Sequence, residues 1–396
     1  MIRVVSFALL IVPPMSFLRG FFQGLQSMGP SAISTVLEQL ARVLFIVAGA
    51  YFSLHVLGLS VADAVGVAVF GAFIGSVAGM GVLLRIFNRR KKLIFNGGDN
   101  QSVPALPLMK EVYAYAIPYI AISLGLPLYQ LIDTYTINAV LMGTGLGQGE
   151  AENVNSVVRL VQTLVLIPVS ITVGLSASLI PSMTRSFVEK DQAGMQKLFN
   201  QSILMLSAVI LPAAIGMLLL GEPLYILLYG KENLPVLGGA ILGLYAPAAI
   251  LIAMSSLTTS MLQAVNQHKR VILGLAAALS VKLALNFWLP PFLQEDGFII
   301  ATYAGYSVSV IYNFWLLKKH FSLNLFGIRL RLASVLTAVV CMAAGISVLK
   351  KGLALHRPEN YLVMDVATMV MLGMLIFAFT IAVINYPRYK RVRSSG

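Results

Sequence analysis

The stretch VADAVGVAVFGAFIGSVAGMGVLLRIFNRRKKL, residues 61–93, decides the fold class. Its first part is an apolar run long enough to cross a bilayer as a helix, which takes about 20 residues. A cluster of arginines and lysines follows immediately. Such a cluster either anchors the end of the helix or lies along anionic lipid headgroups, where each basic residue contributes about 1 kcal/mol. The sequence therefore predicts a membrane-spanning helix with a basic end.

Similar apolar runs recur along all 396 residues, of which 58% are hydrophobic and only 11% are charged. The mean hydropathy is +0.86, so a bilayer must solvate most of the apolar side chains. We expect an all-α polytopic membrane protein with about 11 transmembrane helices. The predicted helices lie near residues 3–24, 31–55, 62–86, 111–134, 154–181, 199–220, 237–262, 270–291, 297–317, 332–349 and 362–386.

Positive charge alternates between the loops. Most of the 28 Lys and Arg residues fall in every second loop and in the C-terminal tail, whereas the loops between them hold few. The positive-inside rule makes the basic loops cytoplasmic. We expect a multi-pass membrane protein with a cytoplasmic C-terminus and, given an odd number of spans, an external N-terminus. The net charge of +13 is then topological bias and does not indicate nucleic-acid binding.

Few residues suit covalent or metal chemistry. The single cysteine, Cys341, excludes a disulfide framework, and the four histidines lack the spacing of a metal motif. There is no P-loop, so the chain does not itself bind a nucleotide to drive transport. We expect no enzyme activity, no catalytic or metal-binding residue and no cofactor. Any transport energy would come from an ion gradient, with a proton or sodium as coupling ion, from the membrane potential or from the gradient of the substrate itself.

The chain also repeats itself at a distance of about 240 residues. The segment VPPMSFLRGFFQGLQ, residues 12–26, aligns with IAMSSLTTSMLQAVN, residues 252–266. Further on, Arg42 aligns with Lys282. The aligned helices are six spans apart and cross the membrane in the same direction, as in a parallel repeat. We therefore expect two pseudo-symmetric lobes, the first lacking three helices at its start, followed by two C-terminal helices.

This repeat predicts four parts of the chain. They are an incomplete N-terminal lobe of three helices at 1–90, a basic and polar cytoplasmic linker at 91–109, a six-helix C-terminal lobe at 110–320, and two accessory helices with a basic tail at 330–396.

The run FLRGFFQGLQSMGPSAISTVLEQLARV, residues 17–43, resembles the signature segment of bacterial polysaccharide-biosynthesis and spore-cortex membrane proteins. These proteins belong to the multidrug/oligosaccharidyl-lipid/polysaccharide exporter superfamily and are related to the lipid II flippases. Residues 126–141 and 158–184 are similar to the family's seventh and eighth helices. The resemblance implies a secondary transporter that flips a polyprenyl-diphosphate-linked sugar or a peptidoglycan precursor across the plasma membrane by alternating access. The alternatives are a drug/cation antiporter of the same superfamily and a non-transporting truncated fragment.

Charged residues within predicted spans are candidate functional residues, because a charge in hydrocarbon is costly unless it is paired or faces water. Resemblance places Arg159 where lipid II flippases carry a cavity arginine, and its guanidinium could bind a diphosphate. Arg42 is expected to pair with Glu38 one turn earlier. Lys282 either pairs with another helix or faces the cavity. Asp133 could bind the coupling ion, but a pair with Arg159 is favoured.

The remaining candidates are polar or kinking residues. Gln130 lies three residues before Asp133 in the sequence and is a further candidate for substrate binding. Arg19 and Gln23 are expected to anchor the end of their helix. Pro127 and Pro168 are expected to kink their helices, which suits the bending of alternating access.

Overall fold

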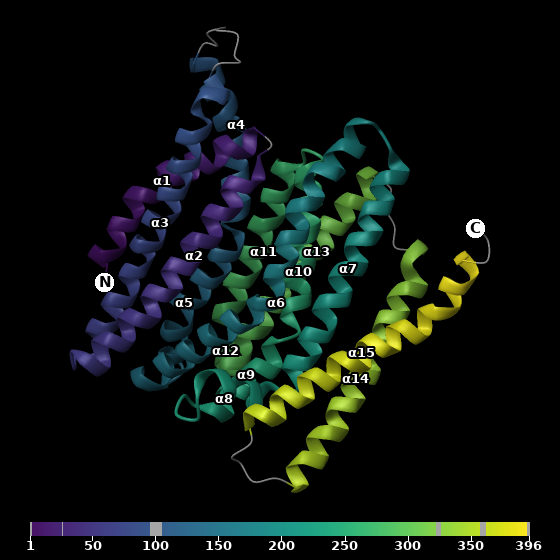
Figure 1. The fold of residues 1–396 in the computed structure, drawn as a ribbon. Helices are drawn as coiled ribbons and strands as arrows, with labels where there is room; N and C mark the ends of the chain where they lie inside the picture. The colour runs from purple at the N-terminus through teal and green to yellow at the C-terminus, as the bar shows by residue number, and fades with distance from the viewer. Residues whose placement is uncertain (1, 26, 96–104, 322–325, 357–361, 394–396) are drawn as a thin grey trace. The chain divides into compact units, whose positions relative to one another are not determined.

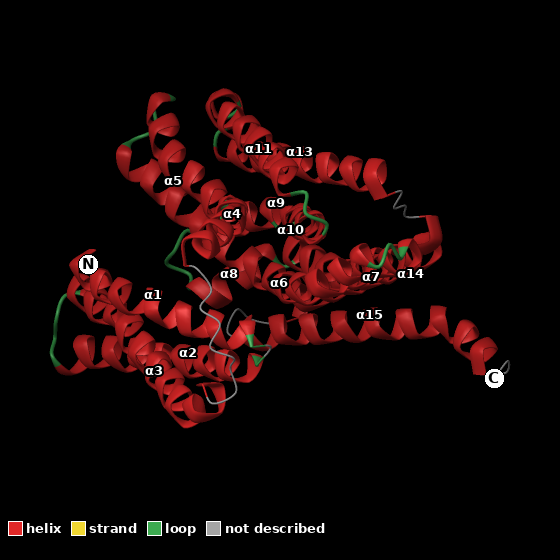
Figure 2. Cartoon of the chain, turned by 90° about the horizontal axis from the view of Figure 1, so that it is seen from above, coloured by secondary structure: helices red, strands yellow, loops and turns green. Residues whose placement is uncertain are grey.

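The computed structural model describes residues 2–25, 27–95, 105–321, 326–356 and 362–393, and their regular structure is entirely helical (Figure 2). The all-α expectation is confirmed. The chain separates into two compact units, Met1–Pro104 and Ala105–Gly396, here called unit 1 and unit 2. Part of the predicted linker (96–104) and the end of the predicted basic tail (394–396) lie outside the described residues.

Unit 1 is a bundle of three long helices that lie side by side (Figure 1). Their bounds are α1 Ile2–Gly24, α2 Met28–Tyr51 and α3 Val61–Phe95, and a π-helical turn, η1 Phe52–Val56, follows α2. Met15, Phe22 and Leu83 form a small core between α1 and α3. The outer side of α2 carries exposed Val36, Leu44 and Val47, as expected for a surface that faces lipid.

Unit 2 contains the other helices. Their bounds are α4 Ala105–Ser123, α5 Gly125–Gly143, α6 Gln148–Val188, α7 Gln192–Leu219, α8 Gly221–Tyr229, α9 Pro235–Tyr245, α10 Ala248–Ala264, α11 His268–Trp288, α12 Pro290–Leu293, α13 Glu295–Phe321, the 3-10 turn η2 Phe326–Ile328, α14 Arg329–His356 and α15 Leu362–Arg393. One apolar core joins α5, α6, α7, α10 and their neighbours. A second, smaller core packs α14 and α15 against α7 and α8, and Figure 1 shows α14 and α15 crossing each other.

Ten segments of the described chain are long and apolar enough to cross a membrane, if each of two bent helix pairs counts as one span. The bent pairs are α4–α5 and α9–α10, each bent by 43°. The eleventh expected span, α13, has 27 residues but is less apolar. It packs against α10 and α11, and its Thr302, Ser309 and Asn313 are buried. Neighbouring helices thus cover the polar residues of α13, as they must within a membrane.

The bend between α4 and α5 lies just before Pro127. Proline has no N–H to donate and its ring crowds the carbonyl group four residues earlier, which belongs to Ser123. The structure divides the predicted helix at this position, because α4 ends at Ser123 and α5 begins at Gly125. Pro118 lies inside α4, and α6 continues through Pro168 without a break.

The packing of the helices supports the internal repeat. Helix α3 packs on α1 and α2, and α13 packs in the same way on α10 and α11. A methyl group added to Gly75 would lie 2.7 Å from the carbonyl oxygen of Glu38, and one added to Gly305 would lie 3.1 Å from that of Ala278. A shift of 240 matches Ala278 with Glu38 but matches Gly75 with Trp315, so the contact corresponds on α2 and α11 and not at the same position of α3 and α13.

Candidate functional site

A buried ion pair lies inside unit 2. Lys282 Nζ on α11 is 2.8 Å from Asp133 Oδ1 on α5, and the two side chains are 0% and 4% exposed. An unpaired charge at such a position would cost several kcal/mol, so each residue makes the burial of the other possible. Of the two roles left open for Lys282, the structure shows the pair with another helix.

Three neutral side chains complete the hydrogen bonding of this pair. Gln162 on α6 donates to Asp133 Oδ2 at 2.7 Å, and Asn286, one turn after Lys282, donates to Asp133 Oδ1 at 3.0 Å. Lys282 donates to Thr302 Oγ1 on α13 at 2.5 Å. The network therefore joins α5, α6, α11 and α13 at one point.

The predicted pair between Asp133 and Arg159 is wrong. Helix α6 turns Val158, Gln162 and Val165 toward the core, whereas Arg159 is exposed. Arg159 therefore lies on the outward face of α6, and from there its side chain cannot reach the Asp133 carboxylate on the inward side of the helix. Sequence reasoning also missed Gln162 and Asn286. Asn286 could have been predicted from the sequence, because it lies four residues after Lys282 and therefore on the same face of an apolar helix.

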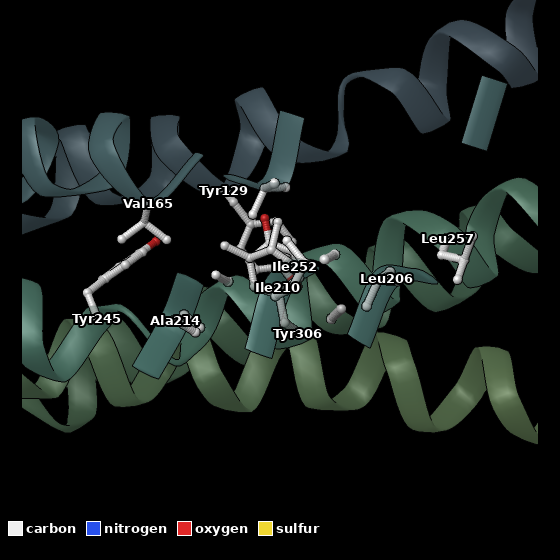
Figure 3. Close-up of a cluster of buried hydrophobic side chains, with 14 of the residues drawn as sticks. Tyr129, Val165, Leu206, Ile210, Ala214, Tyr245, Ile252, Leu257 and Tyr306 are labelled. Atoms are coloured by element: carbon white, nitrogen blue, oxygen red, sulfur yellow. The ribbon is translucent and has the colours of Figure 1, made fainter. Parts of the chain in front are cut away.

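Two stacked tyrosines adjoin the ion pair. The rings of Tyr129 and Tyr306 are 4.0 Å apart and nearly parallel, and Lys282 Nζ lies 5.6 Å from the Tyr129 ring centre. Figure 3 shows Tyr129 and Tyr306 grouped with Ile252, with Tyr245 farther away below Val165. Both hydroxyl groups of the stack are buried without a hydrogen-bond partner among the described residues. Buried polar groups without a partner are rare in proteins, so each hydroxyl is a candidate for a hydrogen bond to a buried water molecule.

A cavity of about 310 Å³ lies next to this stack, within unit 2. Its walls come from α4, α5, α6, α10, α11 and α13. Tyr129 and Tyr306 line it and also line a small space beside Asp133 and the half-buried Gln130. The tyrosine stack thus borders both the cavity and the space next to the ion pair.

Unit 1 has a charged cluster of its own. Arg19 on α1 lies 2.8 Å from Glu38 Oε2 on α2, and Arg42 contacts Glu38 Oε1. The predicted pair of Glu38 and Arg42 is confirmed. Arg19 also donates to Ser34 at 2.9 Å. Two guanidinium groups share one carboxylate, so the cluster keeps a net positive charge, and the Nε atom of Arg42 is buried without a partner among the described residues.

The two remaining polar or basic candidates lie on exposed surfaces. Gln23 is exposed near the end of α1, and Arg159 is exposed on α6. Within the described residues, no group of three His, Cys, Asp or Glu side chains is arranged to hold a metal ion.

Comparison with known proteins places this architecture in a family. The family model for "Polysaccharide biosynthesis protein" matches residues 1–187, and the model for "Lipid II flippase MurJ" matches residues 137–372. The Lipid II flippase MurJ of Bacillus subtilis is 37% identical over 353 residues, which cover 87% of this chain and 65% of that protein. An uncharacterized membrane protein of the same organism, YabM, is 25% identical over 320 residues, covering 81% of this chain and 59% of its own length.

Among solved structures, a Lipid II flippase MurJ in an inward closed conformation matches with a TM-score of 0.64 at 12% identity. The match covers 96% of this chain and 74% of that one, and it shows the fold. The chain spans about two thirds of the length of the curated relatives, or less. Because the MurJ model covers more than half of its residues and the predicted resemblance is confirmed, the chain belongs to the family described as lipid II flippase MurJ.

Proposed function

We propose that this chain is a secondary transporter that flips a polyprenyl-diphosphate-linked sugar or peptidoglycan precursor across the bacterial plasma membrane by alternating access. One observation carries the proposal: both bent helix pairs contribute walls to the cavity of unit 2, through Tyr119 and Leu126 on α4–α5 and Ile252 on α9–α10. Broken spans around a cavity are typical of transporters, in which helix segments move past a binding site. The 37% identity to a protein named as a lipid II flippase supports the same reading.

The charges favour an anionic cargo over a cationic drug. An antiporter for cations needs an intramembrane carboxylate that is free to bind them. Here Glu38 is paired with Arg19 and Arg42, and Asp133 is paired with Lys282. The surplus cation of the unit 1 cluster and the exposed Arg159 are the candidates for the diphosphate, which a guanidinium binds through paired hydrogen bonds.

An apolar groove of unit 2 suits the lipid tail. A hollow of about 690 Å³ lies between α6, α7, α14 and α15, and apolar side chains such as Ile167, Pro212, Met342 and Phe377 line it. The tail would remain in this groove or in the bilayer while the headgroup crosses. In this proposal residues 1–90 act as the N-terminal lobe, 110–320 as the C-terminal lobe and 330–396 as the accessory part. Anionic lipids would contact the basic end of α3.

The orientation of the chain can be tested by labelling single cysteines in intact cells. We expect Glu232→Cys, in the α8–α9 loop, to react with a membrane-impermeant maleimide, and Lys190→Cys, in the α6–α7 loop, to react only after lysis. Both changes are made in a Cys341→Ser background, because Cys341 is exposed. Labelling in the reverse order would contradict the proposed cytoplasmic position of the basic loops.

The proposed function itself is tested with the purified chain in liposomes that contain a fluorescent polyprenyl-diphosphate disaccharide. Flipping exposes lipid of the inner leaflet to an external quencher, and a proton or sodium gradient is imposed in parallel to identify the coupling ion. A loss of protected lipid that is no faster than in protein-free liposomes would exclude the proposal.

Arg159→Gln is expected to slow flipping about tenfold, since one charge-assisted contact to phosphate contributes about 1.5–3 kcal/mol. Folding should be unaffected, because Arg159 is exposed and pairs with no carboxylate in the described chain. Arg159→Lys keeps the charge but loses the paired hydrogen-bond geometry, so its flipping rate should lie between those of the wild type and Arg159→Gln. Thr163→Ala, one turn later on the same exposed stripe, serves as control. An unchanged rate for Arg159→Gln would remove this residue from the site.

A further inference from the structure

Helix α10 presents a neutral polar stripe to the cavity of unit 2. Ser256, Thr259, Ser260 and Gln263 follow one another at the spacing of a single helix face, and all four line the cavity. Other positions of the same helix, including Leu257, are buried in the apolar core. The stripe is therefore directed at the cavity by the fold and does not contribute to the core.

Part of this stripe has unused hydrogen-bonding capacity. The Ser256 hydroxyl and the Gln263 amide form no side-chain hydrogen bond within the described chain. By contrast, Ser260 donates to the Ser256 carbonyl group at 3.0 Å, and Thr259 accepts from Asn313 at 3.1 Å. Polar side chains that line a cavity and lack partners are placed to bind water or the polar groups of a ligand.

The rest of the cavity wall is aromatic and apolar. Tyr119 contributes an exposed ring, and the stacked pair of Tyr129 and Tyr306 closes one side. Among the described residues, no Lys, Arg, Asp or Glu lines the cavity. Its volume of about 310 Å³ lies at the lower end of the range of roughly 300–1,000 Å³ that is usual for small-molecule sites.

These properties together match a saccharide. A sugar ring carries hydroxyl groups around its edge, which exchange hydrogen bonds with hydroxyl and amide side chains. Its faces carry C–H groups, which pack on aromatic rings. A diphosphate, in contrast, requires cations or clustered N–H donors, and this cavity wall has no cationic side chain.

The internal repeat shows that this neutrality is specific to unit 2. The 240-residue shift matches Ser16 with Ser256 and Gln23 with Gln263, but it places Arg19 where α10 has Thr259. The corresponding face of α1 therefore carries a guanidinium that is part of the charged cluster. The same helix face has become cationic in one unit and neutral in the other.

We propose that the cavity of unit 2 is a binding subsite for the uncharged saccharide part of the cargo, with Ser256 and Gln263 as its hydrogen-bonding residues. This rests on the proposed flippase function. The subsite makes the protein select lipids that carry a sugar over the bare polyprenyl diphosphate, which has the same charge but no saccharide.

The test measures dissociation constants of the purified full chain for three probes: polyprenyl diphosphate, the same lipid carrying a neutral disaccharide, and the free disaccharide. In the wild type the sugar-bearing lipid should bind at least tenfold more tightly than the bare lipid, and the free disaccharide should compete only with the former. Ser256→Ala combined with Gln263→Met should weaken binding of the sugar-bearing lipid about tenfold, since two hydrogen bonds are lost. Binding of the bare lipid should stay within about twofold.

Ser347→Ala on α14 is the control, because it removes a serine hydroxyl that bonds to its own helix, as Ser260 does, outside the cavity. Equal weakening of both lipids in the double variant, or no change in either, would overturn the saccharide subsite. Should the double variant fail to fold, the competition experiment on the wild type still tests the subsite, because the free disaccharide should compete only with the sugar-bearing lipid. A wild type that flips and binds both lipids equally overturns only the subsite, whereas one that binds neither lipid overturns the flippase proposal as well.

Discussion

Lys282→Met is expected to lower the free energy of unfolding by about 3–5 kcal/mol, because it leaves the Asp133 carboxylate buried without its counter-charge. Gln162 and Asn286 still donate to Asp133, but neutral donors do not compensate a full charge in a low-dielectric interior. The measurement is the unfolding curve of the purified chain in mixed detergent micelles. Transport should fall in parallel, since the pair holds four helices of unit 2 together.

A double-mutant cycle separates this effect from simple loss of volume. Asp133→Asn combined with Lys282→Met removes both charges, and we expect it to be more stable than Lys282→Met alone. Arg185→Ala is the matched control. Arg185 also pairs with a carboxylate, Glu189 at 2.9 Å, but that pair is exposed, so its loss should change stability little. Equal losses of stability for the buried and the exposed pair would contradict the conclusion that the buried ion pair stabilises unit 2.

Gly75→Ala is expected to destabilise unit 1 by about 1–3 kcal/mol, the usual cost of forcing an extra methyl group into a packed interface. The added methyl group would lie 2.7 Å from the Glu38 carbonyl oxygen and 2.9 Å from Arg42 Cβ. Since α2 cannot move away without shifting Glu38 and Arg42, the charged cluster should be disturbed as well. The unfolding transition and the flipping rate of the variant both report on this change.

Gly66→Ala provides a control on the same helix, because a methyl group there meets nothing within 4 Å. Alanine also favours a helix over glycine by about 1 kcal/mol in water, so this control should be neutral or stabilising. Opposite signs for two identical substitutions on α3 would identify close helix contact as the cause. A Gly75→Ala variant as stable as Gly66→Ala would show that α2 and α3 do not pack as closely as described.

The sequence by itself determined the class of the protein, the approximate positions of its long apolar helices and its family. Apolar runs such as 61–84 have no stable position in water, so they predict spanning helices whatever their neighbours are. The pair of Glu38 and Arg42 was also predictable, because residues four apart lie on the same face of a helix. The signature at 17–43 led to the family that the comparisons then confirmed.

Only the tertiary structure decided which partner Asp133 takes and where the neutral polar stripe of α10 is directed. Asp133 and Lys282 are 149 positions apart in the chain, and helix periodicity carries no information on contacts between distant helices. The choice of Lys282 over Arg159 depends on the rotation of α6, which turns Gln162 inward and Arg159 outward. That rotation follows from how the apolar faces of several helices pack at once. The local sequence therefore shows which residues are charged within the helices, and only the packing determines which of them pair.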